Sequence, residues 1–128
     1  MTTLSEVMRT DFITAAPEDT LGEVAEKMTA LNVGSVVVKD FGALIGILTE
    51  RDLLKAMAAR VHSSEARVRQ FMTVDPITAP AEMDCEEAER LMLDKGFRHL
   101  PVLEGVDVVG VVSLRRVVAA TKTAAASS

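Results

Sequence analysis

The residue run from Gly46 to Asp52 is the part of this sequence best suited to bind a ligand. An apolar run ends at Thr49 and a helical pattern of apolar residues begins at Leu53, so a strand is predicted to lead directly into a helix. Thr49 and Asp52 have the spacing of a capping box. A helix N-terminus attracts anions, and an aspartate in the first turn can accept hydrogen bonds from the two hydroxyl groups of a ribose. The alternative interpretation is a simple helix cap.

The sequence repeats itself without a gap at an offset of 64 residues, as Met8 and Met72 show (72 − 8 = 64). The same offset pairs Thr49 with Ser113, which is also a good N-cap residue. Other identical pairs at this offset are Asp11 and Asp75, Ile13 and Ile77, Thr14 and Thr78, Gly46 and Gly110, and Arg51 and Arg115. Two copies predict a pseudo-twofold pair, because a solenoid needs at least three repeats.

Length and composition limit the possible functions. The chain has 128 residues, so the two repeats are expected to share a core, because a unit of about 60 residues is marginal alone. The net charge of −5 argues against a nucleic-acid or anionic membrane partner. One cysteine, Cys85, excludes an internal disulfide. The polar N-terminus has no signal-peptide pattern, and no apolar run is long enough to span a bilayer. We therefore expect a cytoplasmic protein that binds neither nucleic acid nor membrane.

Each repeat is predicted to form a strand, a helix, two strands and a helix. The predicted strands are residues 12–15, 36–38 and 44–48 in the first copy and 77–79, 100–103 and 106–112 in the second. The residues predicted to start the four helices are Thr20, Thr49, Asp84 and Ser113. The pattern indicates an α/β fold in which helices cover one face of a small sheet. We expect a first repeat over residues 5–62, a second over 63–120, and a flexible tail over 121–128.

The repeat resembles a cystathionine β-synthase (CBS) domain, and the tandem pair resembles the Bateman module of a stand-alone CBS-domain protein. Three features carry the resemblance, which extends from Ser5 to Ala120. They are an Ile-Thr strand shortly after an Asp in both copies, the run from Gly96 to Val102, and the Gly-apolar-apolar-Thr-x-x-Asp pattern at 46–52. The resemblance implies an α+β two-layer fold and a pseudo-symmetric module with two clefts, between the repeats, for adenosine nucleotides or related ligands.

The resemblance also implies roles for individual residues in the first cleft. Thr49 and Asp52 would hold the ribose. The base would contact Pro76, Ile77 and Thr78, and the phosphates would face Arg98, His99 and Arg115. Packing beside Pro101 is the structural alternative for His99.

The second copy departs from the family pattern, because Arg116 stands where the ribose-binding aspartate is expected. Arginine cannot accept a hydrogen bond from a hydroxyl group. The second cleft is therefore predicted to bind ribose poorly or to stay empty. Its residues would be Ile13, Thr14, Ser113 and Arg116. A nearby phosphate would explain Arg115 and Arg116, and exposure to solvent is the alternative.

The resemblance implies a non-catalytic, energy-sensing regulatory module. It would bind AMP, ADP or ATP, need no further cofactor or metal, and signal to an unidentified effector protein by population shift. The residues agree with a non-catalytic role, because the sequence offers no nucleophile–base pair, no metal-ligand cluster and no Gly-rich phosphate loop. Alternative functions are a structural dimerisation module without a ligand and a binder of S-adenosylmethionine or NAD.

A homodimer is expected as well. The two helices that follow Thr49 and Ser113 carry more apolar residues than one small core needs, so a second copy is expected to cover part of them. The apolar residues are Leu53, Leu54, Met57, Val117 and Val118.

Overall fold

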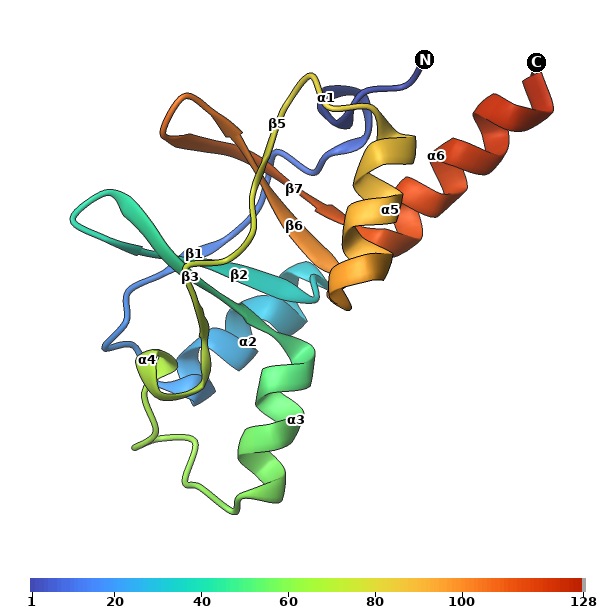
Figure 1. Cartoon of the computed structure of the whole chain (residues 1–128). Coiled ribbons are helices and arrows are strands. Elements are labelled where there is room, and N and C mark those ends of the chain that lie inside the picture. The colour runs from blue at the N-terminus through green and yellow to red at the C-terminus, as the bar shows by residue number, and fades with distance from the viewer. Residues whose placement is uncertain (128) are drawn as a thin grey trace. The chain divides into compact units, whose positions relative to one another are not determined.

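The computed structural model describes the backbone of residues 1–127 and the side chains of residues 1–123. The chain forms two compact units (Figure 1). The central unit is Phe12–Pro76, and the terminal unit combines Met1–Asp11 with the chain from Ile77 onward. These units are not the sequence repeats predicted over 5–62 and 63–120. Each unit is completed by a segment that belongs, in sequence, to the other repeat.

The central unit is a four-stranded sheet with helices. Its elements are β1 (Thr14–Ala15), α2 (Leu21–Leu31), β2 (Ser35–Asp40), β3 (Ala43–Thr49), α3 (Glu50–Ala58), α4 (Val68–Phe71) and β4 (Thr73–Val74). The strand order is β1-β2-β3-β4. β1 runs parallel to β2, and the other neighbours are antiparallel.

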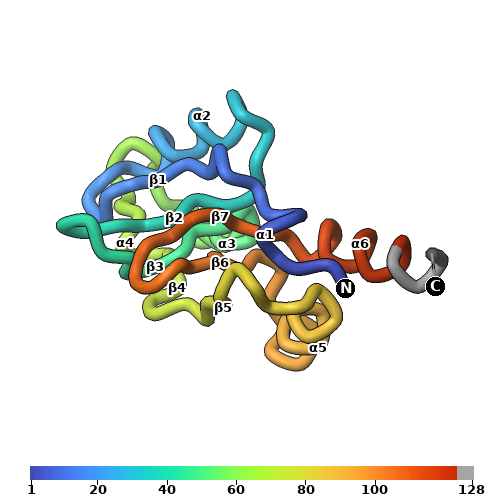
Figure 2. Tube along the Cα trace, turned by 90° about the horizontal axis from the view of Figure 1, so that it is seen from above, coloured from blue at the N-terminus to red at the C-terminus, as the bar shows by residue number. Residues whose placement is uncertain are grey.

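The terminal unit repeats this arrangement. Its elements are α1 (Leu4–Val7), β5 (Ala79–Pro80), α5 (Cys85–Lys95), β6 (His99–Glu104), β7 (Asp107–Ser113) and α6 (Leu114–Ser127). The strand order is β5-β6-β7, and Arg9 forms a bridge to Val111 on β7 where β4 lies in the central unit. The N-terminal helix α1 lies beside β7 and α6 (Figure 2). The predicted α/β fold with two small sheets is confirmed.

Local sequence signals explain where the helices start and end. Side chains of all four predicted capping residues accept a backbone N–H hydrogen bond in the first turn of a helix, and these residues are Thr20, Thr49, Asp84 and Ser113. Asn32 and Gly96 end α2 and α5 in the left-handed conformation, as is common at a helix C-terminus. Glu23 completes the box at Thr20, and the hydrogen bonds it accepts from the Thr20 side chain and backbone lower the pKa of Glu23.

Some predicted boundaries differ from the structure. The strands predicted at 12–15 and 77–79 are only β1 and β5, which lie at sheet edges and pair with one neighbour each. Residues 121–127, predicted as a flexible tail, continue α6 as a helix, because alanine has the highest helix propensity. Ser128 lies outside the described residues.

Each unit has a cluster of buried side chains of its own, where the sequence predicted one shared core. In the central unit, Leu48 on β3 packs with helix α2 and with Val68 of α4. In the terminal unit, Leu100 on β6 packs with helix α5 and with Leu4 of α1. Val68 and Leu4 are both fully buried. The short helices α1 and α4 therefore close the two cores.

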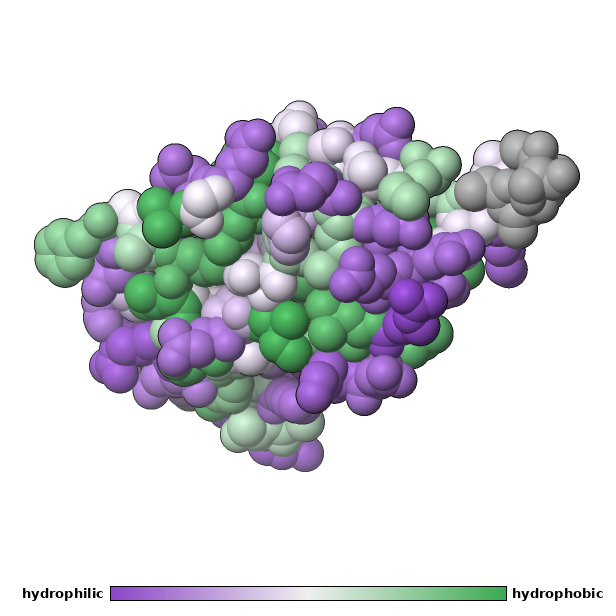
Figure 3. Space-filling model, turned by 45° about the horizontal axis from the view of Figure 1, so that its top comes forward, coloured by the Kyte–Doolittle hydropathy of each residue, from purple (hydrophilic) through white to green (hydrophobic). Residues whose placement is uncertain are grey.

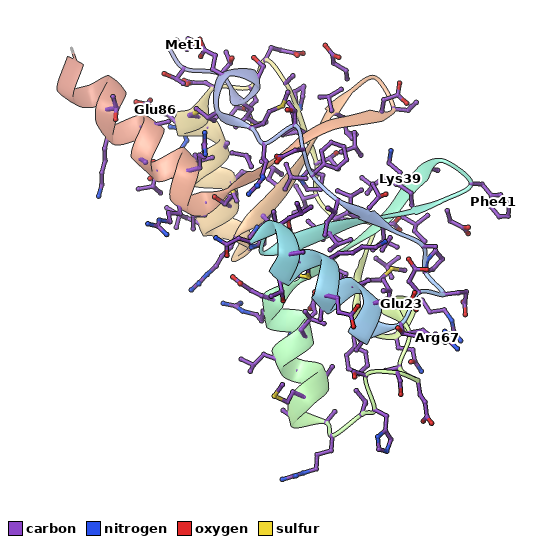
Figure 4. The ribbon with its side chains drawn as sticks, turned by 180° about the vertical axis from the view of Figure 1, so that it is seen from behind. Met1, Glu23, Lys39, Phe41, Arg67 and Glu86 are labelled. Atoms are coloured by element: carbon purple, nitrogen blue, oxygen red, sulfur yellow. The ribbon has the colours of Figure 1, made fainter. Side chains whose placement is uncertain are left out.

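The β2–β3 hairpin ends in an exposed aromatic residue. Phe41 and Gly42 both have positive φ angles, 51° and 80°, which is the pattern of a type I′ turn. Phe41 is fully exposed, and its side chain points away from the hairpin (Figure 4). Other apolar side chains also reach the surface, as the green areas in Figure 3 show.

Replacing Phe41 by asparagine should stabilise the chain. A left-handed conformation costs a bulky residue about 1–2 kcal/mol, and asparagine adopts it more readily. We expect a rise of up to about 1 kcal/mol in the free energy of unfolding, measured by urea denaturation. Phe41→Ala is the matched control, because it removes the ring but keeps the strain. Equal stability of the two variants would show that the turn is not strained.

Candidate functional site

The junction of β3 and α3 forms the capping box that the sequence predicts. Oδ2 of Asp52 accepts hydrogen bonds from the Thr49 backbone N–H at 2.8 Å and from the Thr49 hydroxyl at 3.1 Å. The Asp52 backbone N–H donates in return to Oγ1 of Thr49 at 3.4 Å. Thr49 and Asp52 therefore form a helix cap, whether or not they also contact a ligand.

The cap uses only half of the Asp52 carboxylate. Asp52 is 8% exposed. All hydrogen bonds that described residues donate to its side chain go to Oδ2. No fully buried side-chain oxygen in that part of the chain lacks a partner, so Oδ1 reaches solvent. Oδ1 is thus an open, negatively charged acceptor in a largely buried residue at the start of a helix.

Ser35 is a second polar residue at this junction, and none of the sequence motifs includes it. Within the described chain, the buried polar side chains are those of Ser35 and Asp52. Ser35 opens β2 directly opposite Thr49, and the preceding Gly34 carbonyl accepts the Glu50 N–H at 3.0 Å. The repeat offset could have identified this position, because Ser35 corresponds to the predicted ligand residue His99 (35 + 64 = 99).

The corresponding junction in the terminal unit has the opposite charge. His99 opens β6 opposite Ser113, whose Oγ accepts the Arg116 N–H at 3.2 Å. The Arg98 carbonyl accepts the N–H of the first residue of α6 at 2.8 Å. Arg98, Arg115 and Arg116 are all exposed. The first turn of α6 has no acidic residue, whereas α3 has two there. This junction suits an anion and offers no carboxylate to a ribose.

The other predicted ligand residues lie in extended segments. Pro76 and Thr78 are half-buried, and Ile77 is exposed; all three lie between β4 and β5. Ile13 accepts the Val37 N–H through its carbonyl oxygen at 3.0 Å, and Thr14 begins β1. Ile13 and Thr14 belong to the central unit, whereas Ser113 and Arg116 belong to the terminal unit. Ligand roles for these residues remain predictions.

The only cysteine is not suited to nucleophilic chemistry. Cys85 is fully buried at the start of α5 and packs in the terminal core. Burial raises the pKa of its thiol, and the carboxylates of Asp84 and Glu6 raise that pKa further. A thiol with a raised pKa is a poor nucleophile at neutral pH. Over the described residues, no cluster of three or more His, Cys, Asp or Glu could hold a metal ion, and no helix could cross a membrane.

Comparisons with known proteins match both repeats. The family model of the CBS domain matches residues 4–59 and 68–122. An uncharacterized protein from Methanopyrus kandleri is 38% identical over 115 residues, which cover 88% of this chain and 59% of that protein. The chain therefore spans less than two thirds of this relative.

Solved structures share the fold. A CBS-domain containing protein from Agrobacterium tumefaciens is 32% identical, with a TM-score of 0.86, over 94% of this chain and 99% of that one. A CBS domain pair in complex with 5'-methylthioadenosine and S-adenosyl-L-methionine has a TM-score of 0.87 over 97% of this chain and 98% of that one. It is 23% identical, so that likeness shows the fold alone. The chain belongs to the CBS domain family and carries two CBS domains in tandem.

Proposed function

We propose that the chain is a non-catalytic regulatory module that binds an adenosine nucleotide through Thr49 and Asp52. The observation that carries the proposal is the free Oδ1 of the largely buried Asp52. Because Oδ1 reaches solvent, a ligand hydroxyl group can take the place of water and donate a hydrogen bond to it. The two hydroxyl groups of a ribose supply such donors. Adenosine compounds are named as ligands of one structural neighbour, which favours this class of ligand.

Phosphates distinguish AMP, ADP and ATP from uncharged adenosine compounds. Arginine pairs well with phosphate oxygens, and Arg98, Arg115 and Arg116 are exposed on the terminal unit. We propose that arginines at this junction favour a phosphorylated ligand, with His99, Pro76, Ile77 and Thr78 as further predicted contacts. The bound ligand would shift the population of conformations that an effector protein recognises.

An adenine nucleotide should raise the melting temperature. A ligand that binds only the folded state at a hundredfold excess over its Kd stabilises that state by about 2.7 kcal/mol. We expect AMP, ADP or ATP to raise Tm by at least about 5 °C. Calorimetry or a dye assay is needed, because the chain has no Trp or Tyr.

The same assay can test the role of the ribose. 2'-Deoxy-AMP is the matched control for AMP, because it lacks one of the two hydroxyl groups assigned to Asp52. It should shift Tm less than AMP does. S-adenosylmethionine and 5'-methylthioadenosine test the alternative adenosyl ligands. Absence of a shift with every one of these compounds at millimolar concentration would favour a structural module without a ligand.

The chain is also proposed to form a homodimer through α3. Leu54 and Met57 are 67% and 75% exposed and lie one helical turn apart on α3. Two of the residues predicted from the sequence for the dimer surface are not available for it. Val117 is fully buried in the terminal core, and Leu53 packs against the central core.

A charge on this face should separate the dimer. We expect light scattering at micromolar concentration to give the mass of two chains for the native sequence and of one chain for Leu54→Glu. Glu26→Lys on α2 is a charge-altering control at another exposed position. A native chain that is monomeric at this concentration would contradict the proposal.

A further inference from the structure

Two methionines occupy spaces that glycines leave in the sheets. Gly110 on β7 is buried, and a β-carbon at this position would lie 2.5 Å from Sδ, 2.7 Å from Cγ and 3.0 Å from Cβ of Met8. Gly46 on β3 is also buried. A β-carbon there would lie 2.7 Å from Sδ of Met72. Each thioether thus packs directly against the strand backbone. Any residue other than glycine at that strand position would place its β-carbon in the same space.

Each methionine holds a segment that completes its unit. Met8 precedes Arg9, which exchanges two backbone hydrogen bonds with Val111 at 2.8 and 3.0 Å. Met72 directly precedes β4, which pairs with β3. We call residues 4–11 and 68–75 the closing segments. Each closing segment pairs with its sheet over only a few residues. The methionine at the start of that pairing is therefore expected to contribute much of the stability of the contact.

Met8 and Met72 are the half-buried methionines of the closing segments; Met83 is half-buried too and packs against the terminal core, but it lies outside those segments. Met28 and Met92 are buried in the cores, at 5% and 0% exposure, and an oxidant in solution cannot easily reach them. Met57 is 75% exposed, and its oxidation would disturb no packing within its unit. Met8 and Met72 are half-buried and pack against the core clusters. They combine access from solvent with a structural role.

We propose that Met8 and Met72 are paired oxidation sites, at which a hydroperoxide forms methionine sulfoxide and loosens the closing segments. With hydrogen peroxide, the sulfur lone pair attacks one peroxide oxygen. An S–O bond forms as the O–O bond breaks, and the departing hydroxide takes up the proton from the transferred oxygen to leave as water. Sulfur is oxidised by two electrons, and the peroxide is reduced. The inference is independent of ligand binding.

The glycine spaces make the sulfoxide costly. Oxidation converts an apolar thioether into a polar group with an additional oxygen atom. The sulfoxide oxygen needs hydrogen-bond donors, which apolar packing against the sheet does not supply, so the oxidised side chain is expected to turn from the glycine towards water. The closing segment then loses its packing at the point where its hydrogen bonds to the sheet begin. A methionine sulfoxide reductase reverses the change.

The test is a hydrogen peroxide titration of the full chain, with peptide mass spectrometry to locate each sulfoxide and calorimetry to measure Tm. Conversion of Met8 and Met72 should lower Tm by at least about 5 °C. Met8→Leu combined with Met72→Leu keeps apolar side chains that cannot be oxidised. Its Tm should fall much less than that of the native chain at the same peroxide dose. Met57→Leu combined with Met83→Leu is the matched control, because Met57 lies on the proposed dimer face and Met83 packs against the terminal core. It should lose stability as the native chain does.

Hydrogen exchange of the native chain gives a second readout that needs no variant. Oxidation should speed the exchange of the Arg9 and Val111 amides, which bond to each other's carbonyl groups, and reduction should restore it. Three results would overturn the proposal. They are sulfoxide at Met8 and Met72 without a change in Tm, an equal loss of Tm in the double leucine variant, and resistance of both residues at doses that fully oxidise Met1, which is 97% exposed.

Discussion

Replacing Asp52 by asparagine should lower the affinity for an adenosine nucleotide by about tenfold to a hundredfold. Asparagine can keep the cap, because its amide oxygen accepts the Thr49 N–H in place of Oδ2. Its NH2 group then replaces Oδ1, so a donor faces the ribose where an acceptor is required. Hydrogen bonds to a charged group contribute about 1.5–3 kcal/mol, and about 1.4 kcal/mol corresponds to a factor of ten in Kd. Titration calorimetry measures the change.

Two further variants test whether the effect comes from ligand contact. Asp52→Ala also removes the hydrogen bonds that Asp52 accepts from Thr49, so it should lower both affinity and Tm, whereas Asp52→Asn should change mainly affinity. Arg116→Asp places an acceptor at the corresponding position of α6 and should raise the stoichiometry toward two ligands per chain. If Asp52→Asn folds normally and binds with native affinity, Thr49 and Asp52 are only a helix cap.

Replacing Gly110 by alanine should destabilise the chain by about 1–3 kcal/mol, the usual cost of overpacking a core. The new methyl group would lie 2.5 Å from Sδ and 3.0 Å from Cβ of Met8, so the whole side chain must move. Met8→Ala should recover much of this loss in the double variant, because Sδ and Cγ are then absent. Denaturation of the native chain, both single variants and the double variant gives the coupling energy.

Gly46→Ala is the matched comparison. Its β-carbon would lie 2.7 Å from Sδ of Met72 but also 2.9 Å from the backbone oxygen of Thr73. Removing the methionine cannot relieve a clash with backbone. Met72→Ala should therefore rescue Gly46→Ala less than Met8→Ala rescues Gly110→Ala. Equal rescue at both positions would show that the backbone of β4 can shift as easily as a methionine side chain.

The sequence was sufficient to predict what local signals determine. Alternating apolar runs and capping residues place the strands and helices, and Thr49 and Asp52 form the expected hydrogen bonds because only three positions separate them. The two-repeat organisation follows from the constant offset, and the motifs at 46–52 and 96–102 carry the resemblance to the CBS domain. These features depend on neighbours in sequence, so periodicity and residue type reveal them.

The sequence did not predict how the repeats exchange their closing segments. That arrangement depends on contacts between distant positions, such as Arg9 with Val111, which leave no periodic signal. Ser35 was missed because a serine in a strand is unremarkable until its burial opposite Thr49 is known. The prediction of one shared core was incorrect for the same reason. Leu4 and Val68 each supply the side chain that lets a unit close its own core.

The exchange of closing segments imposes an order on folding during synthesis. All residues of the central unit have been made once Pro76 is added, so this unit can fold while the chain is still growing. Residues 1–11 precede the central unit in the chain, yet Arg9 pairs with Val111 on β7, which is made 102 residues later (111 − 9 = 102). At roughly 5–20 residues per second, the N-terminal segment stays unpaired for about 5–20 s on the ribosome. A segment that is made before the central unit is therefore expected to pair with its sheet only after that unit has folded.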